Sequence, residues 1–410
     1  MNNNTLTYFY DKRISFFVVF YFIASAANAT MKTVLPIPES LWSVISVLWG
    51  GLIVFYLLRA LKPVWKRSAK ILMISYAIFG IAYFISAWKC FSRGEPFGQI
   101  LRATAFLTFA WWIPVGVSVC SVKDKSVLYQ MYLKASFWIS AIMFINLFFH
   151  RTDVVEEGLE YNMFFGFAML TPTLVHLNEF YNKRKRWLLL LAIIEIIALL
   201  LYGNRSILLS VLFFVFYKSV VENRAKTILQ PILFCIVLLF LFIYWEYLIS
   251  NLILVFRSLG MQSRTLEMAI NGSITDSSGR DELWAKCWNM IIEKPVFGWG
   301  LGGEFYTLAN FNSTLTATHV TAASAHNGLL QLLVELGLLF GSIAIIIVVW
   351  PILGLRKVKD PFSKDLILVF FSSYGITRMV SADGFFIAPQ VAVYLYLFYF
   401  YSHCKSESIN

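Results

Sequence analysis

The chain has 410 residues, of which 59% are hydrophobic and only 14% are charged. A soluble globular domain carries about 25% charged residues, so this composition excludes that class. The formal net charge of +11 would suggest nucleic acid binding in a soluble protein. Here the basic residues follow the loops between apolar segments, so the charge indicates membrane topology and we expect no nucleic acid partner.

Apolar segments recur at the length that a membrane-spanning helix requires. A span needs about 20 apolar residues to cross a hydrocarbon core of about 30 Å. About twelve segments qualify, and the sixth, seventh, eighth and eleventh are short or polar at one end, so the count holds to within one or two. The sequence therefore predicts an all-α integral membrane protein in which residues 1–410 form one polytopic domain. The segments lie near 14–36, 41–58, 71–88, 99–120, 129–149, 162–177, 187–203, 206–221, 228–249, 327–354, 366–382 and 385–402.

Lysine and arginine concentrate in alternate loops, as in the run Lys183-Arg184-Lys185-Arg186, while the opposite loops are poor in them. Because cytoplasmic loops carry the excess of basic residues, this pattern predicts a multi-pass membrane protein with both termini in the cytoplasm. Residues 26–29 loosely resemble a signal-peptide cleavage site, but the even topology favours an intact first span. The five cysteines show no metal-binding spacing, so we expect no metal or other cofactor.

Arg205 occupies a very short turn between the seventh and eighth spans, in the sequence Gly203-Asn204-Arg205-Ser206. Charged residues at the membrane are costly and are usually paired or functional. A short hairpin holds Arg205 at the outer surface, whereas a charge that only needs water more often lies on a longer loop. This makes Arg205 a candidate for binding an anionic substrate.

Residues 250–325 form the one long polar interruption, a large outer loop between the ninth and tenth spans. Within it, Ser278 is the expected N-cap of an amphipathic helix of about 14 residues that lies on the membrane surface and is stopped by Pro295. Arg280 in the first turn would share one anion with free backbone N–H groups, and a diphosphate suits such a site. The alternative is an interfacial arginine paired with Asp281 or Glu282.

The loop ends on two further motifs. Four glycines between Phe297 and Glu304 indicate a tight, shaped loop, since no phosphate-binding pattern is present. In Ser324-Ala325-His326-Asn327, Ser324 is the expected N-cap of the tenth span, and His326 in the first turn would stay neutral beside the helix dipole. A neutral imidazole can act as a general base, and the alternative is a hydrogen-bonded interfacial histidine. His319, among threonines, is expected to be a loop residue.

Arg378 and Asp383 lie between the last two spans. They are candidates for substrate binding, with mutual pairing as the alternative.

In their order, three motifs resemble the O-antigen ligase and O-antigen polymerase superfamily. They are Gly203-Asn204-Arg205-Ser206, then Ser278-Gly279-Arg280-Asp281 followed by Lys294-Pro295-Val296-Phe297-Gly298-Trp299-Gly300-Leu301-Gly302, and Ala325-His326-Asn327 running into Glu335-Leu336-Gly337. The resemblance implies a bundle of about twelve helices that transfers a glycan from an undecaprenyl diphosphate carrier to a sugar hydroxyl, with inversion and without a metal.

Residue by residue, the resemblance makes His326 the base, Arg280 and Arg205 the ligands of the lipid diphosphate, and Asp383 a partner at the last outer loop. It implies a lipid-linked glycan donor, a glycan or lipid A core acceptor, contact with membrane lipid, and a chain-length regulator as a further partner.

One departure bears on the reaction. Ligases often carry glycine, threonine or tyrosine three residues after the position of Gly337, where this chain has Phe340. We therefore favour a polymerase of O-antigen, capsule or exopolysaccharide repeat units over a ligase that joins the polymer to lipid A core. The alternative from another class is a polysaccharide-lipid transporter or flippase, which would leave the long outer loop unexplained and for which no inverted repeat is visible.

Overall fold

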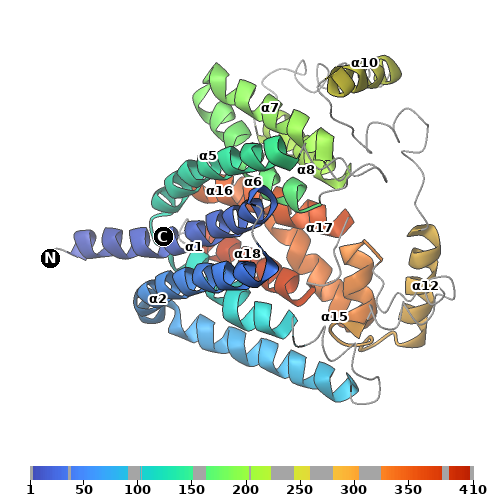
Figure 1. Ribbon diagram of the computed structural model, residues 1–410. Coiled ribbons are helices and arrows are strands. Elements are labelled where there is room, and N and C mark those ends of the chain that lie inside the picture. The colour runs from blue at the N-terminus through green and yellow to red at the C-terminus, as the bar shows by residue number, and fades with distance from the viewer. Residues whose placement is uncertain are drawn as a thin grey trace. The chain divides into compact units, whose positions relative to one another are not determined.

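The computed structural model describes residues 3–35, 38–90, 102, 104–150, 163–202, 205–222, 244–258, 280–303, 325–380 and 387–406. Every regular element within these ranges is a helix (Figure 1), as the sequence predicts. Backbone contacts divide the chain into two units. Unit 1 consists of residues 1–18, 57–128 and 277–410, and unit 2 of residues 19–56 and 129–276.

The helices follow the predicted apolar segments closely. The ninth predicted span, 228–249, lies largely outside the described residues. In chain order the elements are α1 (Asn3–Val34), α2 (Glu39–Cys90), η1 (Thr108–Trp112), α4 (Ile113–Ser121), α5 (Lys125–His150), α6 (Met163–Lys183), α7 (Arg186–Tyr202), α8 (Arg205–Phe216), η2 (Tyr217–Glu222), α10 (Trp245–Ser258), α12 (Arg280–Glu293), α15 (Gly328–Leu353), η4 (Leu355–Lys357), α16 (Pro361–Phe370), η5 (Phe371–Ile376), α17 (Thr377–Val380) and α18 (Ile387–Ser406).

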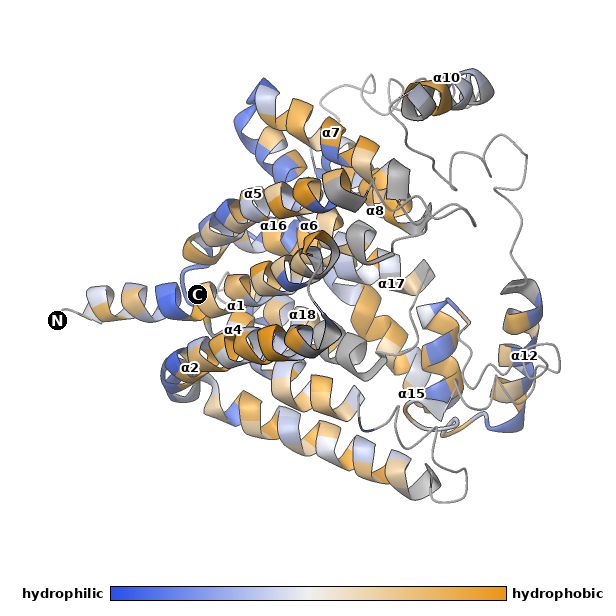
Figure 2. Ribbon diagram, viewed as in Figure 1, coloured by the Kyte–Doolittle hydropathy of each residue, from blue (hydrophilic) through white to orange (hydrophobic). Residues whose placement is uncertain are grey.

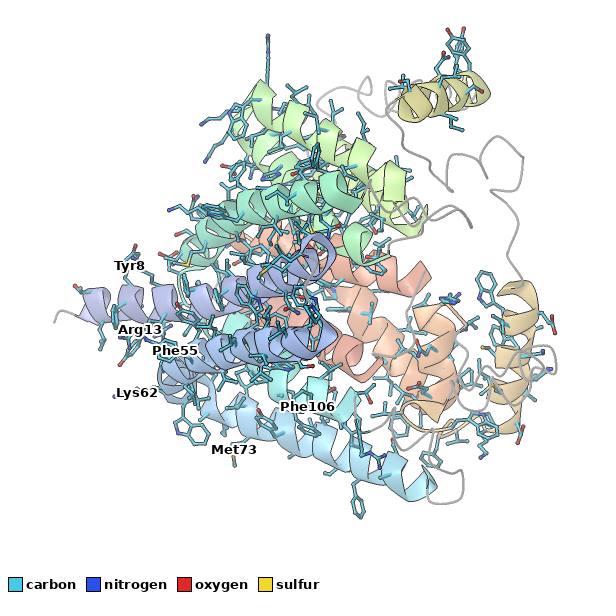
Figure 3. The ribbon with its side chains drawn as sticks, viewed as in Figure 1. Tyr8, Arg13, Phe55, Lys62, Met73 and Phe106 are labelled. Carbon is cyan, nitrogen blue, oxygen red and sulfur yellow. The ribbon has the colours of Figure 1, made fainter. Side chains whose placement is uncertain are left out.

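Four helical stretches within the described ranges are long and apolar enough to cross a membrane. They are Leu41–Ala87, Thr104–Ser121, Lys125–Phe148 and Gly328–Leu353. Large apolar side chains also lie on the outside of the helices, as Phe55, Met73 and Phe106 do (Figure 3); each is at least half exposed. In Figure 2, orange marks the hydrophobic residues along the ribbons of these helices. An apolar exterior of this kind suits a lipid environment, as a multi-pass membrane protein requires.

Helix α2 differs from the prediction, because the second and third predicted spans are joined without a loop. Its 52 residues would extend about 78 Å if straight, far more than one crossing needs. Pro63 lies inside it, and Ser68 has the non-helical angles φ −142° and ψ 24°. The basic residues predicted to form a loop over 59–70 therefore surround a kink within one helix.

A buried ion pair fixes this kink within unit 1. The Arg67 guanidinium contacts the Asp11 carboxylate at 2.5 Å and donates to the carbonyl oxygens of Thr7 and Ser121, each at 3.1 Å. Asp11 is fully buried and also accepts from the backbone N–H of Lys123 at 3.0 Å. Arg67 therefore has a structural role in addition to the topological one that the sequence indicates, since it ties together α1, α2 and the end of α4.

Unit 2 contains a second buried polar cluster. The His176 Nδ1 atom lies 2.9 Å from Glu195 Oε1, and Ser140 Oγ donates to the same oxygen at 2.5 Å. His176 and Glu195 are both fully buried. These three side chains come from α6, α7 and α5, so one carboxylate connects three helices of the unit.

Candidate active site

Helix α12 forms as predicted, from Arg280 to Glu293, and the chain turns at Pro295. One face of the helix is buried through Cys287, Met290 and Ile291, which are at most 2% exposed. This face packs in unit 1 against Trp299, Ala325, Leu330 and Val334. The amphipathic helix, the glycine loop and the start of the last motif therefore share one apolar core, although they are separate in the sequence.

The glycine loop has the backbone conformation that its composition predicts. Gly298, Gly300 and Gly302 have φ values of 58°, 88° and 74°, which other residues rarely adopt. These angles turn the chain tightly after Pro295 and bring the backbone of the loop against α15.

The loop docks on a break within α15. Gly337 has φ 75° and ψ 175°, which interrupts the helix. The N–H groups of Trp299 and Gly300 donate to the carbonyl oxygens of Val334 and Glu335, each at 2.9 Å. The Leu338 N–H donates in turn to the Pro295 carbonyl at 2.6 Å. The loop thus satisfies backbone groups that a broken helix leaves without intrahelical partners.

The two glycines at this junction lie too close for side chains. A Cβ atom on Gly298 would lie 2.5 Å from the carbonyl carbon of Glu335 and from the nitrogen of Gly337. A Cβ atom on Gly337 would meet the Val296 carbonyl in the same way. Glycine is therefore required at both positions by contact as well as by backbone angle.

The break also brings the two parts of α15 close together. A Cβ atom on Gly341 would lie 2.8 Å from the Leu332 carbonyl oxygen, whereas nine residues of straight helix extend about 13 Å. The first part of α15, residues 328–336, therefore bends sharply away from the second part, residues 338–353. Helix α12 runs beside the first part (Figure 1), as their shared core requires.

The start of α15 corrects one prediction. The N-cap is Asn327, whose side chain accepts from the backbone N–H groups of Leu329 and Leu330 at 3.1 and 3.2 Å, and not Ser324, which lies outside the described residues. His326 therefore precedes the helix instead of lying in its first turn. It has the left-handed angle φ 50°, which is uncommon for a residue with a side chain.

A tryptophan joins α12 to the histidine segment. Trp284 Nε1 donates to the carbonyl oxygen of Ala325 at 2.8 Å, and Ala325 is fully buried. Arg280 precedes Trp284 by four residues, so the two positions are neighbours on one helix face. This contact joins α12, whose first residue is Arg280, to the segment that contains His326. The sequence assigns Trp284 no such role, and its hydrogen bond is visible only in the structure.

Glu335 is the second feature that sequence reasoning did not assign. Its side chain is fully buried, while its carbonyl accepts the bond from Gly300 described above. The adjoining Leu301 N–H donates to Ser86 Oγ at 3.0 Å, and Tyr83, one turn earlier in α2, contacts Thr108 at 3.0 Å. The glycine loop is therefore anchored to α2 as well as to α15. In the sequence, the position of Glu335 within an apolar run indicates a buried polar contact here.

The remaining predicted site residues have separate positions. Arg205 is the first residue of α8 in unit 2, and Arg378 lies in α17 of unit 1, a helix that contacts α15. Asp383 lies outside the described residues, as do Ser278 and His319, so the proposed pairing of Arg378 with Asp383 stays a prediction.

Comparison with known proteins agrees with the motifs. Residues 187–357 match the family model described as O-antigen ligase, a segment that contains α12, the glycine loop and both parts of α15. No curated protein matches the chain. The match includes Arg205, Arg280 and His326. Residues 187–357 of this multi-pass membrane chain are therefore similar to the O-antigen ligase family, whose members are membrane enzymes that transfer lipid-linked glycans.

Proposed function

We propose that this protein polymerises glycan repeat units by transferring a glycan from undecaprenyl diphosphate to a sugar hydroxyl at the outer face of the bacterial cytoplasmic membrane. The hydrogen bond from Trp284 to Ala325 is the observation that carries this proposal. It joins α12, which begins at Arg280, to the segment that contains His326, and so supports a site that uses both motifs. Both termini would then lie in the cytoplasm.

The reaction needs a base for the acceptor and stabilisation for the leaving group. The acceptor hydroxyl oxygen attacks the anomeric carbon from the side opposite the diphosphate, and His326 takes its proton. The bond between the anomeric carbon and the diphosphate oxygen breaks, and its electron pair leaves with the diphosphate. The stereochemistry at the anomeric carbon is therefore inverted.

The arginines stabilise the negative charge that develops on the leaving diphosphate. Guanidinium groups present a planar set of donors that fits phosphate oxygens, and donors placed where charge develops lower the barrier most. Arg280 has this role at the first turn of α12, with Arg205 as a second ligand of the diphosphate. Arg378 and Asp383 contribute to substrate binding at the last outer loop. In this scheme two arginines supply what a metal ion supplies in other diphosphate sites.

Gene deletion separates polymerase from ligase. Cells that lack the gene are compared with cells that carry the wild-type gene, and surface glycans are separated by size on a gel. A polymerase predicts that deletion leaves a single repeat unit attached to its normal acceptor. A ligase predicts that no glycan is attached and that polymer accumulates on the lipid carrier. Unchanged glycans would contradict both functions.

A transporter is the competing class. It would place its polar residues at the middle of the bilayer and would move glycan-lipid without lengthening it. The loop that caps the break in α15 and the contact beside His326 favour an enzyme. Incubation of the purified protein with a lipid-linked repeat unit tests this directly, because only an enzyme lengthens the glycan in detergent solution, where no compartments exist.

A further inference from the structure

Helix α12 has three faces with different surroundings. The buried face is the one that packs against the first part of α15. A polar face carries Glu282 and Lys286, which form an ion pair at 2.8 Å, followed by Asn289 and Glu293. Soluble amphipathic helices need only these two faces. The third face of α12 is apolar and exposed.

This third face forms an apolar ridge, defined here as Trp288, Ile292, Val296 and Phe297. Their exposed fractions are 50%, 72%, 49% and 65%. Trp288 and Ile292 are four residues apart and lie in line on the helix, and Val296 and Phe297 continue the line beyond its end. Large contiguous apolar surfaces mark contact with a protein partner or a membrane.

The ridge continues directly into the outer surface of a membrane span. Phe297 stacks on Phe340 of α15, with ring centroids 6.0 Å apart. Below Phe340, the second part of α15 exposes Ile343, Ile346 and Trp350 at 47%, 57% and 49%. Residues 328–353 are apolar and long enough to span a membrane, and exposed apolar side chains on such a helix face the lipid. The ridge and the span therefore present one unbroken apolar surface.

We propose that the apolar ridge is embedded among the acyl chains of the outer leaflet, so that α12 is an interfacial helix in contact with protein, water and lipid on its three faces. Tryptophan is enriched at this depth of the membrane, and burial of the ridge stabilises the position in proportion to its apolar area. The adjoining start of α12 and His326 are then held at the depth of the lipid headgroups. This inference does not depend on the reaction proposed above.

Photocrosslinking tests the contact in the full-length protein. Benzoylphenylalanine replaces one residue at a time in protein reconstituted into vesicles of phosphatidylethanolamine and phosphatidylglycerol, and adducts are identified by mass. Ile292 is the test position, with Phe297 as a second one. Glu293 is the matched control, because it neighbours Ile292 on the polar face, and Ile346 calibrates a lipid-facing position.

We expect a phospholipid adduct at Ile292 and Phe297 comparable with that at Ile346, and loss of this adduct at Glu293. Crosslinks from Ile292 to the same chain or to a second copy would overturn the proposal, as would equal lipid adducts at Ile292 and Glu293. Because no glycan substrate is present, the result is the same whether or not the protein is a polymerase.

Discussion

Trp284 and His326 show how single residues organise this region. His326 has a left-handed backbone angle just before the cap of α15, so the segment depends on its neighbours for this conformation. Trp284 supplies one such neighbour through its bond to the preceding carbonyl. Its other flank contacts the apolar core. The indole therefore positions the histidine segment without a role in the chemistry itself.

Replacement of Trp284 with phenylalanine tests this positioning. The change keeps the aromatic packing and removes the N–H donor, which destabilises the fold by about 1 kcal/mol. A shift of reacting groups by about 1 Å costs about a hundredfold in rate, so we expect glycan transfer to fall by about ten- to a hundredfold while the fold loses only about 1 kcal/mol of stability. Initial rates with purified protein give the comparison. Trp288→Phe, on the exposed face of the same helix, is the control, and equal rates for the two variants would refute the role of Trp284.

Glu195 is a single residue whose buried contacts stabilise unit 2. It is ionisable, fully buried, and bonded to His176 and Ser140. Removal of one partner from a buried pair costs about 3–5 kcal/mol, whereas replacement of both partners by apolar residues is often neutral. We expect Glu195→Ala to lower the free energy of unfolding by that amount, and a His176→Leu, Glu195→Leu double variant to recover most of it. Unfolding of detergent-purified protein followed by circular dichroism measures both, and a single variant as stable as wild type would contradict this account.

Among the elements, the junction of the glycine loop with α15 connects the most distant motifs. The motif at residues 295–303 and the glycine at position 337 are 34 or more residues apart, yet three backbone hydrogen bonds join the motif to the residues on either side of Gly337. Two glycines in contact allow this approach. The bend at the break then places the start of α15 beside α12. The junction thus holds the two motifs together in the fold.

The junction predicts a strong effect of single methyl groups. Gly298→Ala and Gly337→Ala each place a non-glycine residue at positive φ, which costs about 1–2 kcal/mol, and each adds a backbone clash. We expect each variant to lose at least about 2 kcal/mol of stability and to lose transfer activity. Gly80→Ala in α2 is the control, since no atom lies within 4 Å of its added Cβ and alanine favours a helix by about 1 kcal/mol. If all three variants melted at the same temperature, the junction would not be tightly packed.

The sequence predicts helices well and their bends poorly. Apolar length gives the bounds of α5, α7 and α15 to within a few residues, because a hydrocarbon core fixes how long such a segment must be. The kink at Ser68 and the break at Gly337 depend on contacts with distant residues, so local pattern does not reveal them. The cap of α15 was misplaced by three residues for a similar reason, since serine and asparagine are both good caps. The family-like motifs predict Arg280 and His326 as site residues, and this stays a prediction, while the contacts of Trp284 and Glu195 are visible only in the structure.

In the molecule as a whole, α12, the glycine loop and α15 pack together within unit 1. Helix α15 also contacts α17 and α18. The buried pair of Asp11 and Arg67 stabilises another part of the same unit. Under the proposed function, a lipid-linked substrate would bind at α12, the glycine loop and the start of α15, with its glycan near α12 and its carrier among the membrane lipids.

We propose that His326 is the base of a glycan-transfer site, and a pair of histidine variants separates this role from that of a loop residue. His326→Ala and His319→Ala, in the same outer loop region, are expressed at equal levels in cells that lack the gene, and surface glycans are separated on a gel. We predict that His326→Ala gives the glycan pattern of the deletion and that His319→Ala restores the wild-type ladder. A normal ladder with His326→Ala would contradict the claim and remove His326 from the mechanism.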